Sequence, residues 1–278
     1  MRSRRCGLPS PLAMSAKAAK RSSLGDRLRL RKGVDAQSIE FLNIDAPVRT
    51  VKEPGPHYSL GECGRRRMEP MSDTPQEHWD GVYAARAPDA VSWFQSEPAP
   101  SLRMIAAAGI GHDDAVIDIG GGASNLVDRL LARGYRQITV LDICVQALAV
   151  AKARLGRRSV SVDWLVTDIT SWAPPVATFD LWHDRAVFHF LVEKADRQAY
   201  LRALNRALRP DGYVVLAAFA PTGPDRCSGL PVQRYSPELL AAVLGASFQL
   251  IAARTKTHLT PGGVSQDFVW CLFRKIVE

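Results

Sequence analysis

The stretch that most constrains the fold runs from Val116 to Gly122, where an apolar strand ends in an acidic residue and enters a glycine turn. A helical pattern then begins over Ala123–Val127. Glycines at such a turn let the backbone approach a ligand closely, and the free N–H groups of the helix start lie beside it. The stretch therefore predicts the first strand–turn–helix unit of a parallel sheet that binds a nucleotide-like ligand.

The glycine spacing bears on which nucleotide that is. The dinucleotide fingerprint requires a third glycine three positions after the second. Gly120 and Gly122 are followed at that position by Asn125. An NAD(P)-dependent oxidoreductase with a Rossmann-type domain therefore stands as the alternative interpretation, with an imperfect fingerprint.

Five predicted strands follow one another, and four of them end at or beside an acid. The strands are Val116–Ile119, Ile138–Leu141, Val160–Val166, Phe179–Asp184 and Gly212–Phe219, and the acids are Asp118, Asp142, Asp168 and Asp184. Asp142 lies 24 positions after Asp118, where an acid accepts hydrogen bonds from both ribose hydroxyls. One such acid is typical of a helix N-cap, but four at one edge of a sheet indicate a shared site.

Helical patterns separate these strands, and their ends carry stop signals. The apolar stripes lie within Leu126–Leu131, Leu148–Leu155 and Tyr200–Leu208, and they stop at Gly134, Gly156 and Pro210. Alternating strands and helices predict a parallel sheet covered on both faces. The last runs, Phe248–Ala252 and Asp267–Arg274, have no helical pattern between them and should pair as an antiparallel hairpin. The predicted class is α/β.

In this order the motifs resemble those of the class I S-adenosylmethionine-dependent methyltransferases, from Glu77 to the C-terminus. The resemblance implies a Rossmann-like, seven-stranded, mostly parallel sheet with the C-terminal antiparallel hairpin and helices on both faces. It also implies an enzyme that binds S-adenosyl-L-methionine and methylates a small-molecule or protein substrate. The cofactor-binding residues that it implies are Asp118, Gly120, Gly122, Asp142, Ile143, Asp168 and Ile169.

Aromatic residues gather before the glycine turn, in a region without a clear helical or strand period. Trp79, Tyr83 and Trp93 are similar to aromatic pairs at the N-terminus of the small lysine methyltransferases of citrate synthase and elongation factor 1A, in the methyltransferase type 12 group. These three are expected to contact the cofactor as a lid that excludes water. A hydrophobic clasp that holds the segment onto the sheet is the alternative, and both can hold.

The candidate catalytic residues follow the fourth strand: Asp184, His183 and His189. Asp184 is expected to orient the nucleophile or accept its proton, with Arg185 keeping it ionised. An N-cap is its rival role, and a core histidine is the rival role of His189. The lysine methyltransferases read Asp-Lys-Gly-Thr here, whereas this chain has Ala186 and Val187, so a lysine acceptor does not follow. His258 and Gln266 are weaker pocket candidates.

The charge distribution separates the chain into two parts. Residues 1–70 hold 15 Lys and Arg against 7 Asp and Glu, so the net charge of +8 belongs to that segment and residues 71–278 are balanced. We predict a basic, disordered extension over 1–70 and a methyltransferase domain over 71–278. The balance gives no support for a nucleic-acid face on that domain. No apolar run reaches the roughly 18 residues of a membrane helix.

The basic segment has two further interpretations. Met14, Met68 and Met71 are alternative starts, so the segment can be an artefact of start-site choice. Residues 1–34 are Arg-rich and acid-poor, as in a transit peptide, which would place the protein in an organelle matrix instead of the expected cytoplasm. The five cysteines show no metal-ligand spacing and are expected to be reduced, with Cys227 either packed in a loop or facing the substrate. No metal is expected.

Overall fold

The computed structural model describes residues 74–276; segment 1–70, the boundary at residue 71, Cys6 and Cys63 lie outside the described residues. The helices are α2 (Pro75–Ala85), α3 (Ala99–Ala108), α4 (Leu126–Ala132), α5 (Val145–Leu155), α6 (Lys194–Ala207) and α7 (Pro237–Leu244), with short 3-10 turns η2 (Gly156–Ser161) and η3 (Phe188–Phe190). The strands are β1 (Ala115–Ile119), β2 (Gln137–Asp142), β3 (Val162–Val166), β4 (Phe179–Arg185), β5 (Leu208–Phe219), β6 (Arg226–Cys227), β7 (Leu230–Pro231), β8 (Phe248–Leu259) and β9 (Ser265–Lys275).

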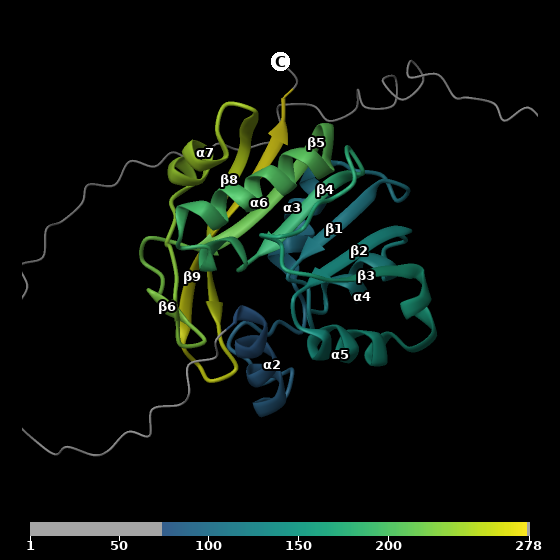
Figure 1. Cartoon of the computed structure of the whole chain (residues 1–278), viewed down its shortest axis with the longest axis vertical. Coiled ribbons are helices and arrows are strands. Elements are labelled where there is room, and N and C mark those ends of the chain that lie inside the picture. Colours follow the sequence, from purple (N-terminus) through teal and green to yellow (C-terminus); the bar gives the residue numbers. More distant parts are fainter. Residues whose placement is uncertain (1–73, 277–278) are drawn as a thin grey trace, which may run out of the picture. The chain divides into compact units, whose positions relative to one another are not determined.

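The main sheet has seven strands in the order β3-β2-β1-β4-β5-β9-β8. The first five strands pair in parallel, whereas β9 runs antiparallel to both β5 and β8 (Figure 1). The predicted mixed sheet and terminal hairpin are therefore confirmed. The hairpin is longer than expected, because β8 and β9 remain paired from Phe248 opposite Lys275 to Leu259 opposite Ser265.

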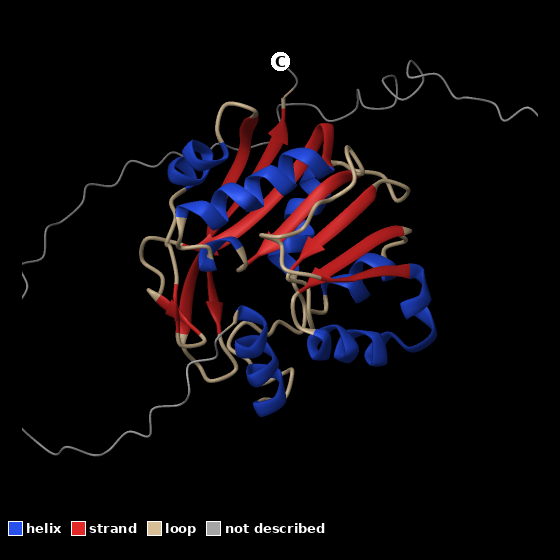
Figure 2. Ribbon diagram, in the orientation of Figure 1, coloured by secondary structure: helices blue, strands red, loops and turns tan. Residues whose placement is uncertain are grey.

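Helices cover both faces of the sheet, each over its own apolar core (Figure 2). On one face α6 and α7 pack through residues such as Leu204 and Leu240. On the other face α3, α4 and α5 pack through Ile105, Leu130 and Leu148. Successive side chains of a strand point to opposite faces, so each strand contributes alternately to the two cores.

The predicted helix stops are confirmed where glycine ends a helix. Gly134 follows α4 with a φ of 86°, and the N–H of Tyr135 donates to the Leu130 carbonyl, as a left-handed helix end requires. Gly156 is itself the C-cap of α5, with a φ of 57°, and its N–H donates to the carbonyl oxygens of Lys152 and Ala153. In the described part of the chain, no helix is long and apolar enough to cross a membrane.

The prediction that the aromatic region before the glycine turn lacks regular structure is wrong, because it contains α2 and α3. None of the residues of α2 is fully buried, and its apolar stripe is short, consisting of the half-buried Trp79, Val82 and Tyr83, so its period is weak. Its start nevertheless carried a readable signal. The Thr74 side chain accepts from the N–H of Glu77, and the Glu77 carboxylate accepts from the N–H of Thr74, with Pro75 at the first helical position.

Candidate functional site

A cavity of about 500 Å³ opens at the carboxyl ends of the parallel strands. Figure 1 shows α2 at this edge of the sheet, between the turn of the β8–β9 hairpin and the start of α5. Nine of the candidate residues line it: Gly120, Asp142, Ile143, Asp168, Ile169, Trp79, Tyr83, Trp93 and Gln266. Tertiary structure thus brings together residues from three strand ends, α2, the loop after it and the terminal hairpin.

Of the glycine turn after β1, Gly120 lines the cavity, whereas the predicted cofactor-binding residue Gly122 is not among its lining residues. Gly120 has a φ of 63° and Gly122 one of 41°, both in the left-handed region that favours glycine. A Cβ atom at Gly122 would stand 2.8 Å from Oδ2 of Asp142 and 3.2 Å from the hydroxyl oxygen of Tyr83. The N–H of Gly120 donates to the Leu141 carbonyl at 2.7 Å, which ties the turn to β2.

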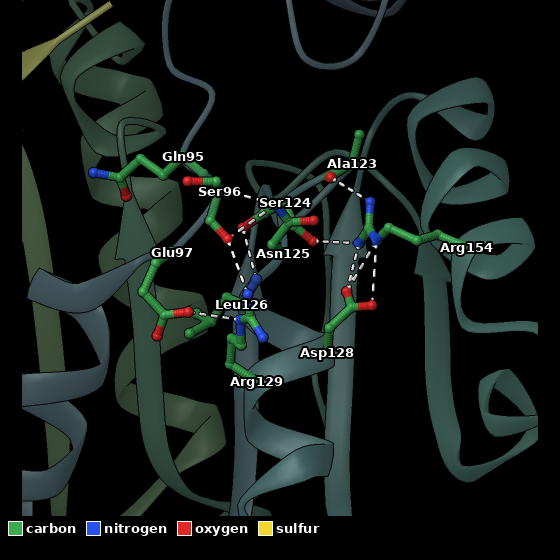
Figure 3. Close-up of polar contacts among 10 residues, drawn as sticks. All are labelled: Gln95, Ser96, Glu97, Ala123, Ser124, Asn125, Leu126, Asp128, Arg129 and Arg154. Atoms are coloured by element: carbon green, nitrogen blue, oxygen red, sulfur yellow. Dashed lines mark hydrogen bonds and ion pairs between the residues drawn. The ribbon is translucent and has the colours of Figure 1, made fainter.

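Two side chains hold the end of this turn from outside the cavity (Figure 3). Arg154 of α5 donates to the carbonyl oxygens of Ala123 and Ser124 at 2.9 and 2.7 Å, and it pairs with Asp128. The side-chain amide of Asn125 donates to the Gln95 carbonyl at 2.9 Å. Asn125, at the position where a dinucleotide fingerprint has glycine, therefore anchors the segment around Gln95 to the turn.

Asp142 is a buried carboxylate at the tip of β2, directly beside the glycine turn. Its Oδ1 accepts from the N–H of Cys144 at 2.8 Å, while Oδ2 faces Gly122. Burial is the main cause that raises the pKa of Asp142 to about 7, and the charge of Asp118 adds to the shift. A carboxyl in a cleft whose pKa is raised by burial marks a candidate functional site.

The opposite end of the cavity is aromatic. Its rings come from α2, the loop after it, η3, β5 and β9: Trp79, Trp93, Phe190, Phe219 and Phe268. The rings of Trp79 stand edge-on to Trp93 and Phe190 at centroid distances of 5.7 and 5.1 Å. These contacts fix α2 against the sheet and also wall the cavity, so the clasp and lid interpretations describe the same residues.

The geometry does not place Asp184 at the cavity. Its side chain is fully buried toward α6, where it accepts from the N–H groups of Val187 and Phe188 at 2.9 and 3.1 Å and from the Tyr200 hydroxyl at 2.7 Å. Arg185 does not pair with it, because adjacent residues of β4 point to opposite faces of the sheet. The expected Asp184–Arg185 pair is therefore wrong, and the contacts are those of the rival capping role.

His183 and Asp118 form a buried pair that also lies behind the cavity wall. His183 Nδ1 lies 2.7 Å from Oδ1 of Asp118, and its Nε2 lies 2.9 Å from the Ser101 hydroxyl. The three residues come from β4, β1 and α3 and are all buried. Their contacts join α3 to the sheet, and neither Asp118 nor His183 lines the cavity.

His189 is fully buried between the rings of Phe190 and Phe219, and both of its ring nitrogens lack a partner among the described residues. Burial, helped by the charge of Arg185, lowers the pKa of His189 to about 3. It is therefore neutral at physiological pH and a weak proton acceptor. Like Asp184 and His183, it does not line the cavity, and its geometry is that of the core histidine named as its rival role.

The sequence analysis gave Arg185 only the role of keeping Asp184 ionised, whereas in the structure Arg185 lines the aromatic end of the cavity. Its position after an acid at the end of β4 was the available signal. Cys227 also lines the cavity and is a free thiol, as are Cys144 and Cys271, which are buried in packing positions. His258 lines only a neighbouring hollow. Residues 74–276 contain no group of three or more potential metal ligands.

Comparison with known proteins agrees with this arrangement. Residues 116–212 match a protein family described as a methyltransferase domain. EEF1A lysine methyltransferase 2 of Danio rerio is 22% identical over 216 residues, which cover 72% of this chain and 86% of that protein.

Two solved structures share the fold. One, described for the conversion of a disulfide bond into a thioacetal group during echinomycin biosynthesis, has a TM-score of 0.59 at 20% identity and covers 72% of this chain and 93% of that one. The other is N-methyltransferase NodS from Bradyrhizobium japonicum WM9 in complex with S-adenosyl-L-homocysteine, with a TM-score of 0.56 at 16% identity, covering 70% and 97%. At 20% and 16% identity, these two structures show only that the fold is shared.

Proposed function

Because the chain is a class I S-adenosylmethionine-dependent methyltransferase, we propose that it methylates a small molecule that the cavity encloses beside the cofactor. The observation that carries the proposal is the continuity of one cavity from the Asp142 carboxylate to the aromatic rings around Phe268. Its volume of about 500 Å³ lies within the range of small-molecule sites. The alternative of an NAD(P)-dependent oxidoreductase is set aside, because residues 116–212 match a methyltransferase domain.

The residues at the strand ends fit the cofactor. The glycine turn packs closely against its neighbours, since a Cβ at Gly120 would collide with Val187 and one at Gly122 with Oδ2 of Asp142, and the Asp142 carboxylate lines the cavity together with Gly120. We assign the ribose hydroxyls to Asp142 and the purine side to Ile143, Asp168 and Ile169. Tyr83, whose hydroxyl lies over Gly122, closes this end.

S-adenosylmethionine, when bound, supplies a methyl group already activated by its sulfonium. The protein then has to align the acceptor in line with that methyl group and keep water away. Trp79, Trp93 and Phe268 provide apolar walls for both tasks. In this proposal Asp184, His183 and His189, first expected to be catalytic, have structural roles, because none of the three is among the residues that line the cavity.

A protein acceptor is the second candidate, because the similarity to EEF1A lysine methyltransferase 2 covers 72% of the chain. The charge at the aromatic end of the cavity argues against a lysine acceptor. Arg185 is the cation at the aromatic end, and a lysine ammonium entering there would meet both the guanidinium and the sulfonium of the cofactor.

The test is to incubate the full chain with a cell extract and methyl-labelled S-adenosylmethionine, and then to separate small molecules from macromolecules by ultrafiltration. We expect the label in the small-molecule fraction and none when the Asp142→Asn variant replaces the wild type. Label confined to a band of the size of eEF1A would support the second candidate and refute the first. Purified eEF1A with labelled cofactor provides the direct check.

A further inference from the structure

We propose that Arg185 binds a negatively charged oxygen group of the methyl acceptor, so that the enzyme selects acceptors with an anionic group on an aromatic or apolar body. The inference rests on the proposed function and concerns the same cavity. It begins from Arg185 itself, at the end of β4, among the residues that line the aromatic end.

The guanidinium of Arg185 is incompletely satisfied. Its Nη1 donates to the Trp93 carbonyl at 2.8 Å, and its central carbon lies 5.3 Å from the centre of the Phe268 ring. Nε and Nη2 are shielded from solvent and have no hydrogen-bond partner among residues 74–276. Leaving a charged donor buried and unpaired is costly, so a native site that retains one is expected to meet an anion from elsewhere.

None of the neighbouring groups supplies that anion. His189 and His258 are neutral at physiological pH, because burial lowers the pKa of each. Cys227 keeps its proton, since burial raises the pKa of its thiol to about 11. The carboxylate of Asp118, which also attracts Arg185, is engaged by His183 at 2.7 Å.

The surroundings reinforce the positive charge. A second hollow of about 320 Å³ shares Arg185 with the main cavity, and Arg103 and Lys256 line it with no carboxylate among its lining residues. The main cavity is lined by three acidic residues: Asp142 and Asp168 belong to the strand ends that we assign to the cofactor, and Asp196 lies in the first turn of α6. The acceptor end thus combines aromatic walls with a cation, which suits an aromatic carboxylate or phenolate.

A different anion could come from the cofactor itself, whose amino-acid portion carries a carboxylate. Binding of S-adenosylhomocysteine and of 5′-methylthioadenosine, which lacks that carboxylate, distinguishes the two sources. We expect Arg185→Gln to change neither affinity more than about twofold, well below the tenfold effect typical of a lost charge-assisted hydrogen bond. Loss of S-adenosylhomocysteine affinity with unchanged methylthioadenosine affinity would assign Arg185 to the cofactor and overturn the proposal.

The acceptor side is tested with benzoate, benzamide and benzylamine as probes, titrated into the full chain saturated with S-adenosylhomocysteine. We expect benzoate to bind at least about tenfold more tightly than neutral benzamide, and benzylamine to bind most weakly. Arg185→Gln should remove the preference, Arg185→Lys should keep part of it, and the exposed control Arg254→Gln should keep all of it.

The outcomes separate the two proposals. If S-adenosylhomocysteine binds but benzoate shows no advantage over benzamide, or keeps its advantage in Arg185→Gln, the assignment of Arg185 fails and the methyl-transfer proposal stands. If label from the extract experiment appears only on protein, the small-molecule proposal fails. Thermal unfolding of each ligand-free variant checks folding; a large drop in Tm for Arg185→Gln alone would mark the guanidinium as structural and overturn the assignment.

Discussion

At the scale of single residues, Asp142 should decide cofactor affinity. Its Oδ2 faces the glycine turn, and losing a charge-assisted hydrogen bond costs about 1.5–3 kcal/mol, or roughly ten- to over a hundredfold in affinity. We expect Asp142→Asn to weaken S-adenosylhomocysteine binding by that factor in a calorimetric titration. Asp163→Asn, on the exposed surface of β3, is the matched control and should bind normally. Normal binding by Asp142→Asn would refute the assignment of the ribose hydroxyls to Asp142.

The same carboxyl predicts a pH dependence. Burial raises the pKa of Asp142 to about 7, and the ionised form is the better acceptor of hydroxyl protons. Affinity for S-adenosylhomocysteine should therefore rise about tenfold from pH 6 to pH 8, and the rise should flatten in Asp142→Asn.

In the ligand-free protein, the stability of the fold depends on pH with the opposite sign to the cofactor affinity. A pKa raised from about 4 in the unfolded chain means that this group favours the folded state at low pH, and that its contribution is lost as pH rises toward 7. Asp142→Asn should thus gain stability relative to wild type over that interval, as measured by urea unfolding at pH 5 and pH 8. A difference that does not change with pH would contradict the shifted pKa.

Asp184 should affect stability far more than the binding of cofactor. Its two oxygens accept from two backbone N–H groups and the Tyr200 hydroxyl, so an amide NH₂ there would face a donor. We expect Asp184→Asn to lower the free energy of unfolding by about 1–3 kcal/mol, with S-adenosylhomocysteine affinity of the folded protein nearly unchanged. A stable variant with impaired turnover would instead restore Asp184 as a catalytic group.

At the scale of elements, the glycine turn depends on α5 for its shape. Arg154 donates to the carbonyl oxygens of Ala123 and Ser124 across about thirty residues of sequence (Figure 3). Removing this forked anchor should cost about 1–2 kcal/mol of positioning, so Arg154→Ala is expected to weaken S-adenosylhomocysteine binding roughly five- to thirtyfold. Arg154→Lys should bind with an affinity between those of Arg154→Ala and the wild type. The exposed control Arg157→Ala should keep wild-type affinity. Equal affinities in all three would show that the turn holds itself.

At the scale of the whole molecule, the described residues 74–276 contain the complete sheet and the cavity. A chain that starts at Met71 keeps Thr74, Glu77 and all of α2, so it should retain cofactor affinity. We expect its Tm to lie within a few degrees of that of the full chain, measured by calorimetry. Insolubility or lost binding would show that residues 1–70 are needed for the fold.

The strands, their acidic ends, the helix stops and the terminal hairpin could be predicted from sequence, because each depends on local spacing and residue type. The directions of the Asp142 and Asp184 side chains could not be predicted from sequence. Both acids end parallel strands, but only tertiary structure shows that Asp142 faces the ligand cavity while Asp184 faces α6 and Tyr200. The short helix α2 was not predicted, because its apolar stripe is short and only half-buried.

What the sequence by itself determined is therefore the order of strands and helices and the chemistry of the cofactor end, because these follow from hydrophobic period and from glycine and acid at fixed spacing. Only the tertiary structure decided which groups meet at the acceptor end. Arg185, Phe219 and Phe268 lie on three different strands, and the pleat of each strand determines which of its side chains reach the cavity. Pairing of β4, β5 and β9 in their observed register brings those three side chains together from strands that are far apart in the sequence.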